Sequence, residues 1–394
     1  MPDDISNYGI AEPEDVLDPR HYEQVRDPAQ SRSLPLWCYT SQRFFNAEMQ
    51  KLFLPGWSLL DRVEKVPNVG DFFTKNFMNI PLLIVRGDDR KVRVFANTCR
   101  HRGALVATGE GNCKGFRCPY HAWTYALDGG LIGAPEFEGP DGKPLIDATN
   151  KQEFGLVEME CDTWGGFIFV KFEKNDTKLS DQLGDFGERL KSHQLEEMVC
   201  VKEMVFNMDA NWKYFVENYS DAYHIPTVHR DSLAQWKGIR SPQPEPQGHY
   251  RLSLVVHEGS QLLLPGQQGF PAMPQIDPDK AKGTIFTAVH PNMMMTLGND
   301  GALVFNSEPL SPTKSRLTVS LLFPKSTVAR NDFQDIVKNY YHRNDMVVGE
   351  DVDIALRQQA GIESPYARAG RLGRTETGIN AINNWILDQV VGRA

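Results

Sequence analysis

Hydrophobic positions along the chain change their spacing several times, and these changes predict helical and strand-rich parts. From Ser41 to Phe53, apolar residues recur at helical spacing, and Ser41 is placed to cap the helix. From Trp57 to about Phe172 the pattern becomes that of short strands. Two of them, at 81–85 and 92–96, flank the turn residues Gly87-Asp88-Asp89 and are predicted to form a hairpin. We therefore expect an all-β domain in the first half of the chain.

The second half alternates helices with strand-like runs. Predicted helices cover 179–193, 211–224, 328–361 (in two pieces) and 375–391, and predicted strands cover 201–208, 250–256, 284–290, 302–305 and 317–323. This order of elements is typical of an antiparallel sheet with helices around it, which is an α+β architecture. We place the domain boundaries at 1–40 for an N-terminal arm, 41–175 for the β domain and 176–394 for the α+β domain.

Composition and charge narrow the class of protein. The chain has 394 residues and a formal net charge of -9, without a long run of Lys or Arg. Neither nucleic acid nor an anionic membrane surface is therefore expected as a partner. No stretch of about 18 apolar residues predicts a membrane helix, and the polar, acidic N-terminus is unlike a signal peptide. Six cysteines in a chain of this length fit a reduced, cytoplasmic setting better than a disulfide framework.

Two Cys-plus-His pairs form the first candidate site. Cys99-Arg100-His101 is followed, after sixteen residues, by Cys118-Pro119-Tyr120-His121, and both pairs are predicted on loops at hairpin ends. Such a set suits either one tetrahedral zinc or a [2Fe–2S] cluster of the Rieske type, with two cysteines on one iron and two histidines on the other. Zinc sites usually show C-x-x-C pairs or a helical H-x₃₋₅-H, so the spacing favours the cluster.

A second candidate site follows at the predicted helix 211–224. Asn218, Asp221 and His224 are three residues apart and are expected on one helix face, and Pro226 is expected to end the helix near His224. His229 then lies beyond the break, so two imidazoles converge from different backbone directions. With a carboxylate, they would form the facial triad that binds Fe(II); the alternative is two structural histidines at a helix end. Spacing leaves the carboxylate open among Asp345, Glu350, Asp351 and Asp353.

At these two sites the chain resembles the large subunit of Rieske non-haem iron oxygenases. Residues 99–103 and 118–129 resemble the two halves of the family's Rieske motif, except that Ala122 stands where the family usually has Gly. We expect a minor backbone adjustment at Ala122. The D-x-x-H-x-x-x-x-H run from Asp221 to His229 resembles the family's iron motif. The likeness covers nearly the whole chain and implies a Rieske [2Fe–2S] domain at 41–175, a helix-grip catalytic domain at 176–394, and an arm at 1–40 that joins the latter.

The resemblance also implies a role for each site residue. The cluster ligands are Cys99, His101, Cys118 and His121, and the ligands of the mononuclear Fe(II) are His224, His229 and Asp351, with Asp353 second to Asp351. Asp221 is the catalytic bridge that joins His224 to the partner subunit's His121 and carries electrons between them, and Asn218 supports the iron site.

By this resemblance the protein is a terminal oxygenase. The resemblance implies that a partner reductase or ferredoxin supplies electrons from NAD(P)H. The chain has no G-x-G-x-x-G fingerprint after a strand, which fits the need for a separate reductase. Apolar residues in the second half favour an apolar, aromatic substrate, as in aromatic hydrocarbon catabolism, for mono- or dihydroxylation or for oxidative N- or O-dealkylation. They are Leu262-Leu263-Leu264, Phe270, Met273, Ile285, Phe286, Met293-Met294-Met295, Leu303 and Phe305. The alternatives are a quaternary-amine monooxygenase acting on betaine- or carnitine-like compounds, a Rieske electron-transfer protein, and a zinc-stabilised binding module.

The tail from Gln358 to Leu372 resembles members with one type of large subunit, which favours a homotrimer.

Overall fold

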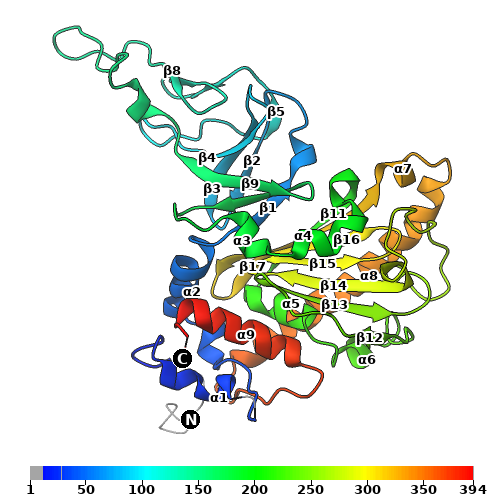
Figure 1. The fold of residues 1–394 in the computed structure, drawn as a ribbon. Helices are drawn as coiled ribbons and strands as arrows, with labels where there is room; N and C mark the ends of the chain where they lie inside the picture. The colour runs from blue at the N-terminus through cyan, green and yellow to red at the C-terminus, as the bar shows by residue number, and fades with distance from the viewer. Residues whose placement is uncertain (1–11, 28, 394) are drawn as a thin grey trace. The chain divides into compact units, whose positions relative to one another are not determined.

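The computed structural model describes residues 12–27 and 29–393, and the chain divides into two compact units (Figure 1). One unit is Leu59–Asp176; the other combines the described residues up to Ser58 with those from Thr177 onward. The junction between Asp176 and Thr177 lies one residue from the boundary predicted after residue 175. The junction between Ser58 and Leu59 differs from the boundary predicted after residue 40. The segment from Ser41 to Ser58, which we assigned to the β domain, belongs to the other unit.

A buried ion pair explains why that segment leaves the β domain. The helix capped by Ser41 consists of α2 (Gln42–Glu48) and the π-helical turn η4 (Met49–Phe53). Its Glu48 lies 2.7 Å from the ammonium group of Lys213 on α5, and both side chains are fully buried. Breaking such a pair leaves a buried charge uncompensated, so α2 is held in the unit that contains α5.

The unit Leu59–Asp176 is built from strands and loops. Its seven-stranded sheet has the order β1-β10-β9-β4-β3-β2-β5, and a second sheet has the order β6-β7-β8. The predicted hairpin is confirmed as β3 and β4, with Ile84 opposite Val94. The strands are β1 (Ser58–Arg62), β2 (Asp71–Phe77), β3 (Ile80–Arg86), β4 (Val92–Ala96), β5 (Glu110–Asn112), β6 (Phe116–Arg117), β7 (Thr124–Tyr125), β8 (Leu131–Gly133), β9 (Glu158–Trp164) and β10 (Phe167–Lys171).

The other unit contains an antiparallel seven-stranded sheet with the order β11-β17-β16-β15-β14-β13-β12. Its strands are β11 (Met198–Met208), β12 (Ile239–Ser241), β13 (Tyr250–Val256), β14 (Gly283–Val289), β15 (Met293–Leu297), β16 (Ala302–Ser311) and β17 (Lys314–Pro324). Its helices, besides α2, are α1 (Glu23–Arg26), α3 (Leu179–Leu183), α4 (Phe186–Leu190), α5 (Trp212–Tyr219), α6 (Ile225–Val228), α7 (Lys325–Val328), α8 (Phe333–Ile362) and α9 (Thr377–Val390). The expected α+β fold class is confirmed.

Most predicted elements of this unit are present, with four differences. The helix predicted in two pieces at 328–361 is one continuous helix, α8. The helix predicted at 179–193 is broken at Gly184, which has a φ of 53° and separates α3 from α4. Strands β12 and β15 were not predicted, the latter because Met293-Met294-Met295 shows no alternation when both faces are buried. The helix predicted at 211–224 ends earlier, as described below.

The sheet and two helices enclose the space in which the candidate site lies. Helix α5 contacts β16, β17 and α8, and Figure 1 shows it lying against the sheet. The ring of Phe215 on α5 lies 5.5 Å from that of Phe305 on β16. In an antiparallel ladder directly opposed residues share a face, and the register from Phe305 through Met294 and Ala288 to Arg251 marks the face that α5 covers. No helix among residues 12–27 and 29–393 is long and apolar enough to cross a membrane.

Candidate metal centres

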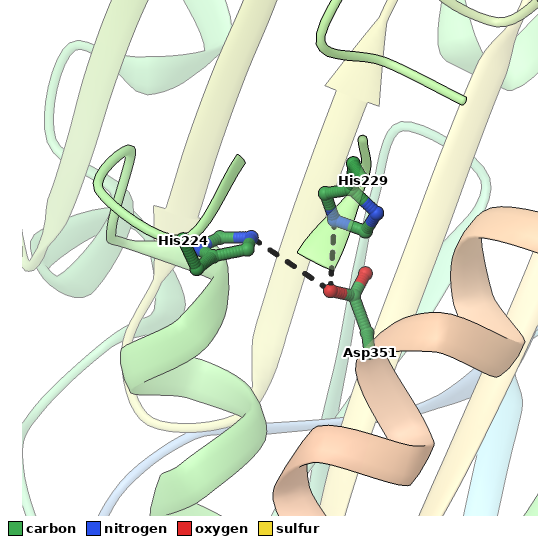
Figure 2. A group of neighbouring side chains, drawn as sticks. All are labelled: His224, His229 and Asp351. Carbon is green, nitrogen blue, oxygen red and sulfur yellow. Dashed lines mark ion pairs between the residues drawn. The ribbon is translucent and has the colours of Figure 1, made fainter. Parts of the chain in front are cut away.

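Two histidines and one aspartate from two distant segments meet beside α5 and α8. Oδ1 of Asp351 lies 3.0 Å from Nε2 of His229 and 3.8 Å from Nε2 of His224. One ligand atom from each residue lies within 4.8 Å of the other two, and Figure 2 shows both rings directed at the carboxylate. Asp353, the second candidate, instead pairs with the exposed Arg357 at 2.8 Å. The donor set of two imidazoles and one carboxylate fits Fe(II) with open coordination positions.

The backbone reaches this geometry in a way that the sequence did not predict. Helix α5 ends at Tyr219, so Asp221 and His224 do not continue its face. The Asp221 carboxylate accepts hydrogen bonds from the backbone N–H groups of Tyr223 (2.5 Å) and His224 (3.2 Å), which forms a tight turn. Pro226 then lies in the first turn of α6, where proline is favoured because no helical N–H is needed there. The expectation that Pro226 ends a helix was wrong: it starts one.

Gly378, near the start of α9, packs against this turn. A Cβ atom at that position would lie 2.0 Å from the carbonyl oxygen of Ser220. Only glycine therefore permits the close approach of α9 to the end of α5. The turn that carries His224 is thus held by the hydrogen bonds of Asp221 and by its packing against α9.

Each member of the triad has a hydrogen-bond partner that orients it. His224 Nδ1 lies 3.0 Å from Oδ2 of Asp221, and His229 Nδ1 lies 2.8 Å from Oε2 of Glu350. The Asn218 amide donates to Oδ1 of Asp351 at 2.7 Å. With each Nδ1 facing a carboxylate, both Nε2 atoms are left to face Asp351. Such partners fix the tautomer and the ring orientation of metal-binding histidines.

Glu350 is the residue whose position sequence reasoning missed. We considered it only as a rival to Asp351 for the metal. The side chain of Glu350 is longer than that of Asp351 and lies one residue earlier on α8. It reaches Nδ1 of His229 and also accepts a hydrogen bond from Ser232 Oγ at 2.7 Å. The sequence feature that could have indicated this role is the pair of consecutive acidic residues, Glu350 and Asp351, on one predicted helix.

These contacts shift the acid–base behaviour of the site. Burial lowers the pKa of His229, but its hydrogen bonds to Asp351 and Glu350 outweigh burial and the pKa lies above its usual value. Burial raises the pKa of Asp221, but the hydrogen bonds from His224 and the backbone outweigh it and the pKa lies below its usual value. Asp221 is thus kept as a carboxylate that accepts from His224.

The four predicted cluster residues belong to the other unit. Cys99 follows β4, Cys118 follows β6, and both belong to the buried core of this unit. The rings of His101 and His121 lie 4.6 Å apart. His101 Nδ1 is buried and has no hydrogen-bond partner in the part of the chain that the structure describes, whereas His121 is exposed. Two buried thiols and two imidazoles, one with an orphaned nitrogen, fit a Rieske cluster as a donor set.

Neighbouring aromatic residues hold these loops in place. The indole of Trp123 stacks on His101 with centroids 4.9 Å apart, and the Tyr125 hydroxyl lies 3.2 Å from Cys99 Sγ. At Gly129, with a φ of 84°, a Cβ atom would lie 2.5 Å from the ring of Phe95. Ala122 has a φ of 59°. The backbone thus adopts the left-handed conformation that glycine favours, at a cost of about 1–2 kcal/mol for alanine.

A cavity of about 580 Å³ adjoins the triad. Of the apolar residues that we expected to form a pocket, Phe286 and Phe305 line it. The others lie in the sheet core or, as with Leu263, Leu264 and Phe270, around a separate cavity of about 270 Å³. Further lining residues are Tyr219, Trp236, Thr296 and Val347. The cavity is therefore more polar than the sequence predicted.

Two family models match the two units. The model described as "Ring hydroxylating alpha subunit (catalytic domain)" matches residues 195–392, and that of the "Rieske [2Fe-2S] domain" matches residues 56–145. These domains carry a mononuclear iron and a [2Fe–2S] cluster, in agreement with the two donor sets.

Curated relatives cover most of the chain. Choline monooxygenase of Atriplex hortensis is 28% identical over 358 residues, which are 88% of this chain and 76% of that protein. The glycine betaine monooxygenase oxygenase subunit of Pseudomonas aeruginosa is 25% identical over 401 residues, which are 94% of this chain and 91% of the relative.

Solved structures show the same fold. The quaternary ammonium Rieske monooxygenase CntA in complex with L-carnitine has a TM-score of 0.74 and 24% identity, and the match covers 91% of this chain and 96% of that one. Naphthalene 1,2-dioxygenase from Rhodococcus sp. has a TM-score of 0.79 and 19% identity, and the match covers 95% of this chain and 97% of that one.

Proposed function

The chain belongs to the ring-hydroxylating alpha-subunit family of Rieske non-haem iron oxygenases, and we propose that it oxygenates a small quaternary ammonium compound. The observation that carries this proposal is the cavity with aromatic walls next to His224, His229 and Asp351. When bound, the two iron centres supply electron relay and O₂ activation. The residues of this chain position the substrate and hold the protons and charges around it.

We assign the metal-holding residues by geometry and donor chemistry. His224, His229 and Asp351 would hold the mononuclear iron, and Cys99, Cys118, His101 and His121 the cluster. Asn218, Asp221 and Glu350 keep the donor atoms of the triad aligned through the hydrogen bonds described above. A facial arrangement leaves one side of the metal free for O₂ and substrate.

We further propose that electrons enter the iron site through Asp221. Its carboxylate is bound to His224, and the exposed His121 is available for contact with a second copy of the chain. In a homotrimer, Asp221 would accept a hydrogen bond from the partner subunit's His121 and link the cluster of one chain to the iron of the next. A separate reductase or ferredoxin would reduce the cluster. The solved structure of a quaternary ammonium Rieske monooxygenase, 23% identical to this chain, gave insights into inter-subunit electron transfer in that enzyme, which supports the proposal.

The aromatic lining favours a methylated ammonium group near the iron. The ring of Tyr219 lies 5.4 Å from that of Phe305 and 6.4 Å from that of Phe286, and Trp236 lines the same cavity. Aromatic faces attract quaternary ammonium ions through cation–π interactions. The choline and glycine betaine monooxygenases among the relatives agree with this class. The same rings would also accept the apolar aromatic substrate that we expected from the sequence, which is the second candidate.

A substrate panel tests the proposal. The purified protein, with both iron centres and a matched reductase, is offered choline, glycine betaine, L-carnitine, naphthalene and benzoate. We expect O₂ uptake that matches product formation with a quaternary ammonium compound, and a hydroxylated or demethylated product by mass spectrometry. Coupled turnover of naphthalene or benzoate alone would favour the second candidate, and zinc without sulfide in the purified protein would contradict both.

A further inference from the structure

The cavity beside the triad has an excess of positive charge. Its lining includes four arginines and two carboxylates: Arg240, Arg251, Arg343, Arg374, Asp221 and Asp351. Both carboxylates are already engaged, Asp221 with His224 and Asp351 with the triad and Asn218. Bound iron would add further positive charge at that end. A substrate that is only a cation would therefore meet an unfavourable field in this cavity.

Two of the arginines lie on neighbouring strands near the sheet edge, four residues apart in register. Arg251 on β13 lies opposite Ala288, and Arg240 on β12 lies opposite Val255. Since alternate residues share a face, Arg240 and Arg251 project from the same face as Phe286, which lies opposite Ser253. Arg251 on β13 is thus one strand away from Phe286 on β14, which is part of the aromatic wall of the cavity.

Neither guanidinium of this pair has a carboxylate partner within the described part of the chain. No ion pair within 4.0 Å joins Arg240 or Arg251 to Asp or Glu, although Arg189 of the same unit pairs with Asp185 at 2.7 Å. Burial lowers the pKa of Arg251, the neighbouring charge of Arg240 adds to this, and Glu245 opposes it only from beyond ion-pair distance. Arg240 is exposed whereas Arg251 is half-buried, so Arg251 is the guanidinium of this pair whose charge a bound anion would neutralise.

A third arginine gives independent support. Arg343 of α8 lines the same cavity and is only 4% exposed. Within residues 12–27 and 29–393 its Nε atom has no hydrogen-bond partner, and its Nη1 atom donates one long hydrogen bond, 3.4 Å, to Oδ1 of Asn344. A buried charge is costly unless it is paired. The carboxylates of Asp351 and Glu350 act on this guanidinium from beyond ion-pair distance. No closer counter-ion is present among the described residues, so a negatively charged ligand in the cavity would be attracted to it.

We propose that the substrate carries a carboxylate that binds to Arg251 and Arg240, with its reactive end among Tyr219, Phe286 and Phe305. This inference rests on the proposed function, because it concerns the same cavity. Tyr219 follows Asn218, whose amide contacts Asp351, so the aromatic end lies toward the triad. Among quaternary ammonium compounds, the arrangement selects a zwitterion of the betaine type over choline, which has no carboxylate.

Equilibrium binding to the protein with both iron centres tests this inference. Isothermal titration calorimetry compares two matched pairs, glycine betaine with choline and benzoate with benzamide. We expect the carboxylate of at least one pair to bind at least tenfold more tightly than its matched partner. Hydrogen bonds to a charged group contribute about 1.5–3 kcal/mol, so Arg251→Gln and Arg240→Gln should each weaken that carboxylate at least tenfold. Affinity for the partner without a carboxylate should stay within twofold.

Control variants separate recognition from folding. Arg330→Gln removes an exposed arginine that pairs with Asp332 away from the cavity, and it should bind both pairs as the wild type does. Arg251→Lys keeps the charge and should retain part of the preference. The cluster absorption spectrum and the thermal unfolding midpoint verify that each variant is folded.

Three results would overturn the inference: tighter binding of choline and benzamide, no binding of either carboxylate to the wild type, or equal weakening of both members of a pair by Arg251→Gln. Turnover is scored separately. A carboxylate preference that depends on Arg251, without turnover of any ammonium compound, would contradict the proposed function and leave anion recognition supported.

Discussion

Nδ1 of His229 lies 2.8 Å from Oε2 of Glu350, and Nε2 of the same ring lies 3.0 Å from Oδ1 of Asp351, the next residue on α8. Two adjacent carboxylates therefore face opposite sides of one imidazole. By our proposal, the first orients the ring by accepting a hydrogen bond from Nδ1, while the second would hold the metal together with Nε2. This division of roles lets one turn of helix set both a ligand and its orientation.

Changing Glu350 to alanine should weaken iron binding without removing a ligand. Loss of an outer hydrogen-bond partner typically costs about 10- to 100-fold in metal affinity. We expect a loss in that range, measured as iron retained against a competing chelator, with the sulfide content of the cluster unchanged. Ser232→Ala removes only the support of Glu350 and should have a smaller effect. Normal iron affinity in Glu350→Ala would show that the hydrogen bond does not position the ring.

Replacement of Asp351 should have a different result. Asp351→Ala removes a proposed ligand and should leave less than about a tenth of the mononuclear iron, because two imidazoles alone do not complete a facial triad. Asp353→Ala serves as the matched control, since its carboxylate is 62% exposed and pairs with Arg357. Metal analysis with separate quantification of cluster sulfide distinguishes the two sites. Equal iron loss in both variants would contradict the assignment of Asp351.

Asp221→Asn tests the electron path. The amide can still cap the turn at Tyr223 and face His224, so both iron centres should stay largely occupied. The charge that would accept a hydrogen bond from the partner subunit's His121 is lost, and steady-state turnover should fall by at least about 100-fold. Rapid-reaction spectroscopy should show a cluster that is reduced normally but reoxidised slowly in the presence of substrate and O₂. Wild-type reoxidation in this variant would exclude Asp221 as the bridge.

The sequence predicted the chemistry of the two sites better than the backbone that carries them. Residue type and spacing singled out the pairs Cys99/His101 and Cys118/His121, each on one short loop, and the structure places the rings of the two histidines 4.6 Å apart. The turn at Asp221 was missed because a carboxylate that bonds to its own backbone competes with the helix, and apolar periodicity does not report such bonds. Pro226 was misjudged for a related reason: its effect depends on whether it lies inside or at the start of a helix.

Long-range packing was beyond the reach of local patterns. The helix at Ser41–Phe53 was predicted correctly, yet its assignment to the β domain was wrong because the Glu48–Lys213 pair joins residues 165 positions apart. The polar character of the cavity was missed for the same reason. Arg240 and Arg251 acquire their common face only through the pairing of β12 with β13.

The pH dependence of stability should show the titration of Glu217. Burial raises the pKa of this carboxyl from 4.5 to about 7, although the Tyr39 hydroxyl donates to it at 2.7 Å and Lys213 attracts it. Between pH 4.5 and 7 the folded protein thus holds a proton that the unfolded chain releases, so the free energy of unfolding falls as pH rises. For this shift, the loss across the interval is roughly 3 kcal/mol.

The Glu217→Gln variant tests this, because its side chain stays neutral. Its free energy of unfolding, measured by urea unfolding at a series of pH values, should change less over this interval than that of the wild type. Because His residues titrate in the same range, the difference between wild type and variant is the quantity to compare. A constant difference from pH 4.5 to 7 would show that Glu217 is ionised throughout.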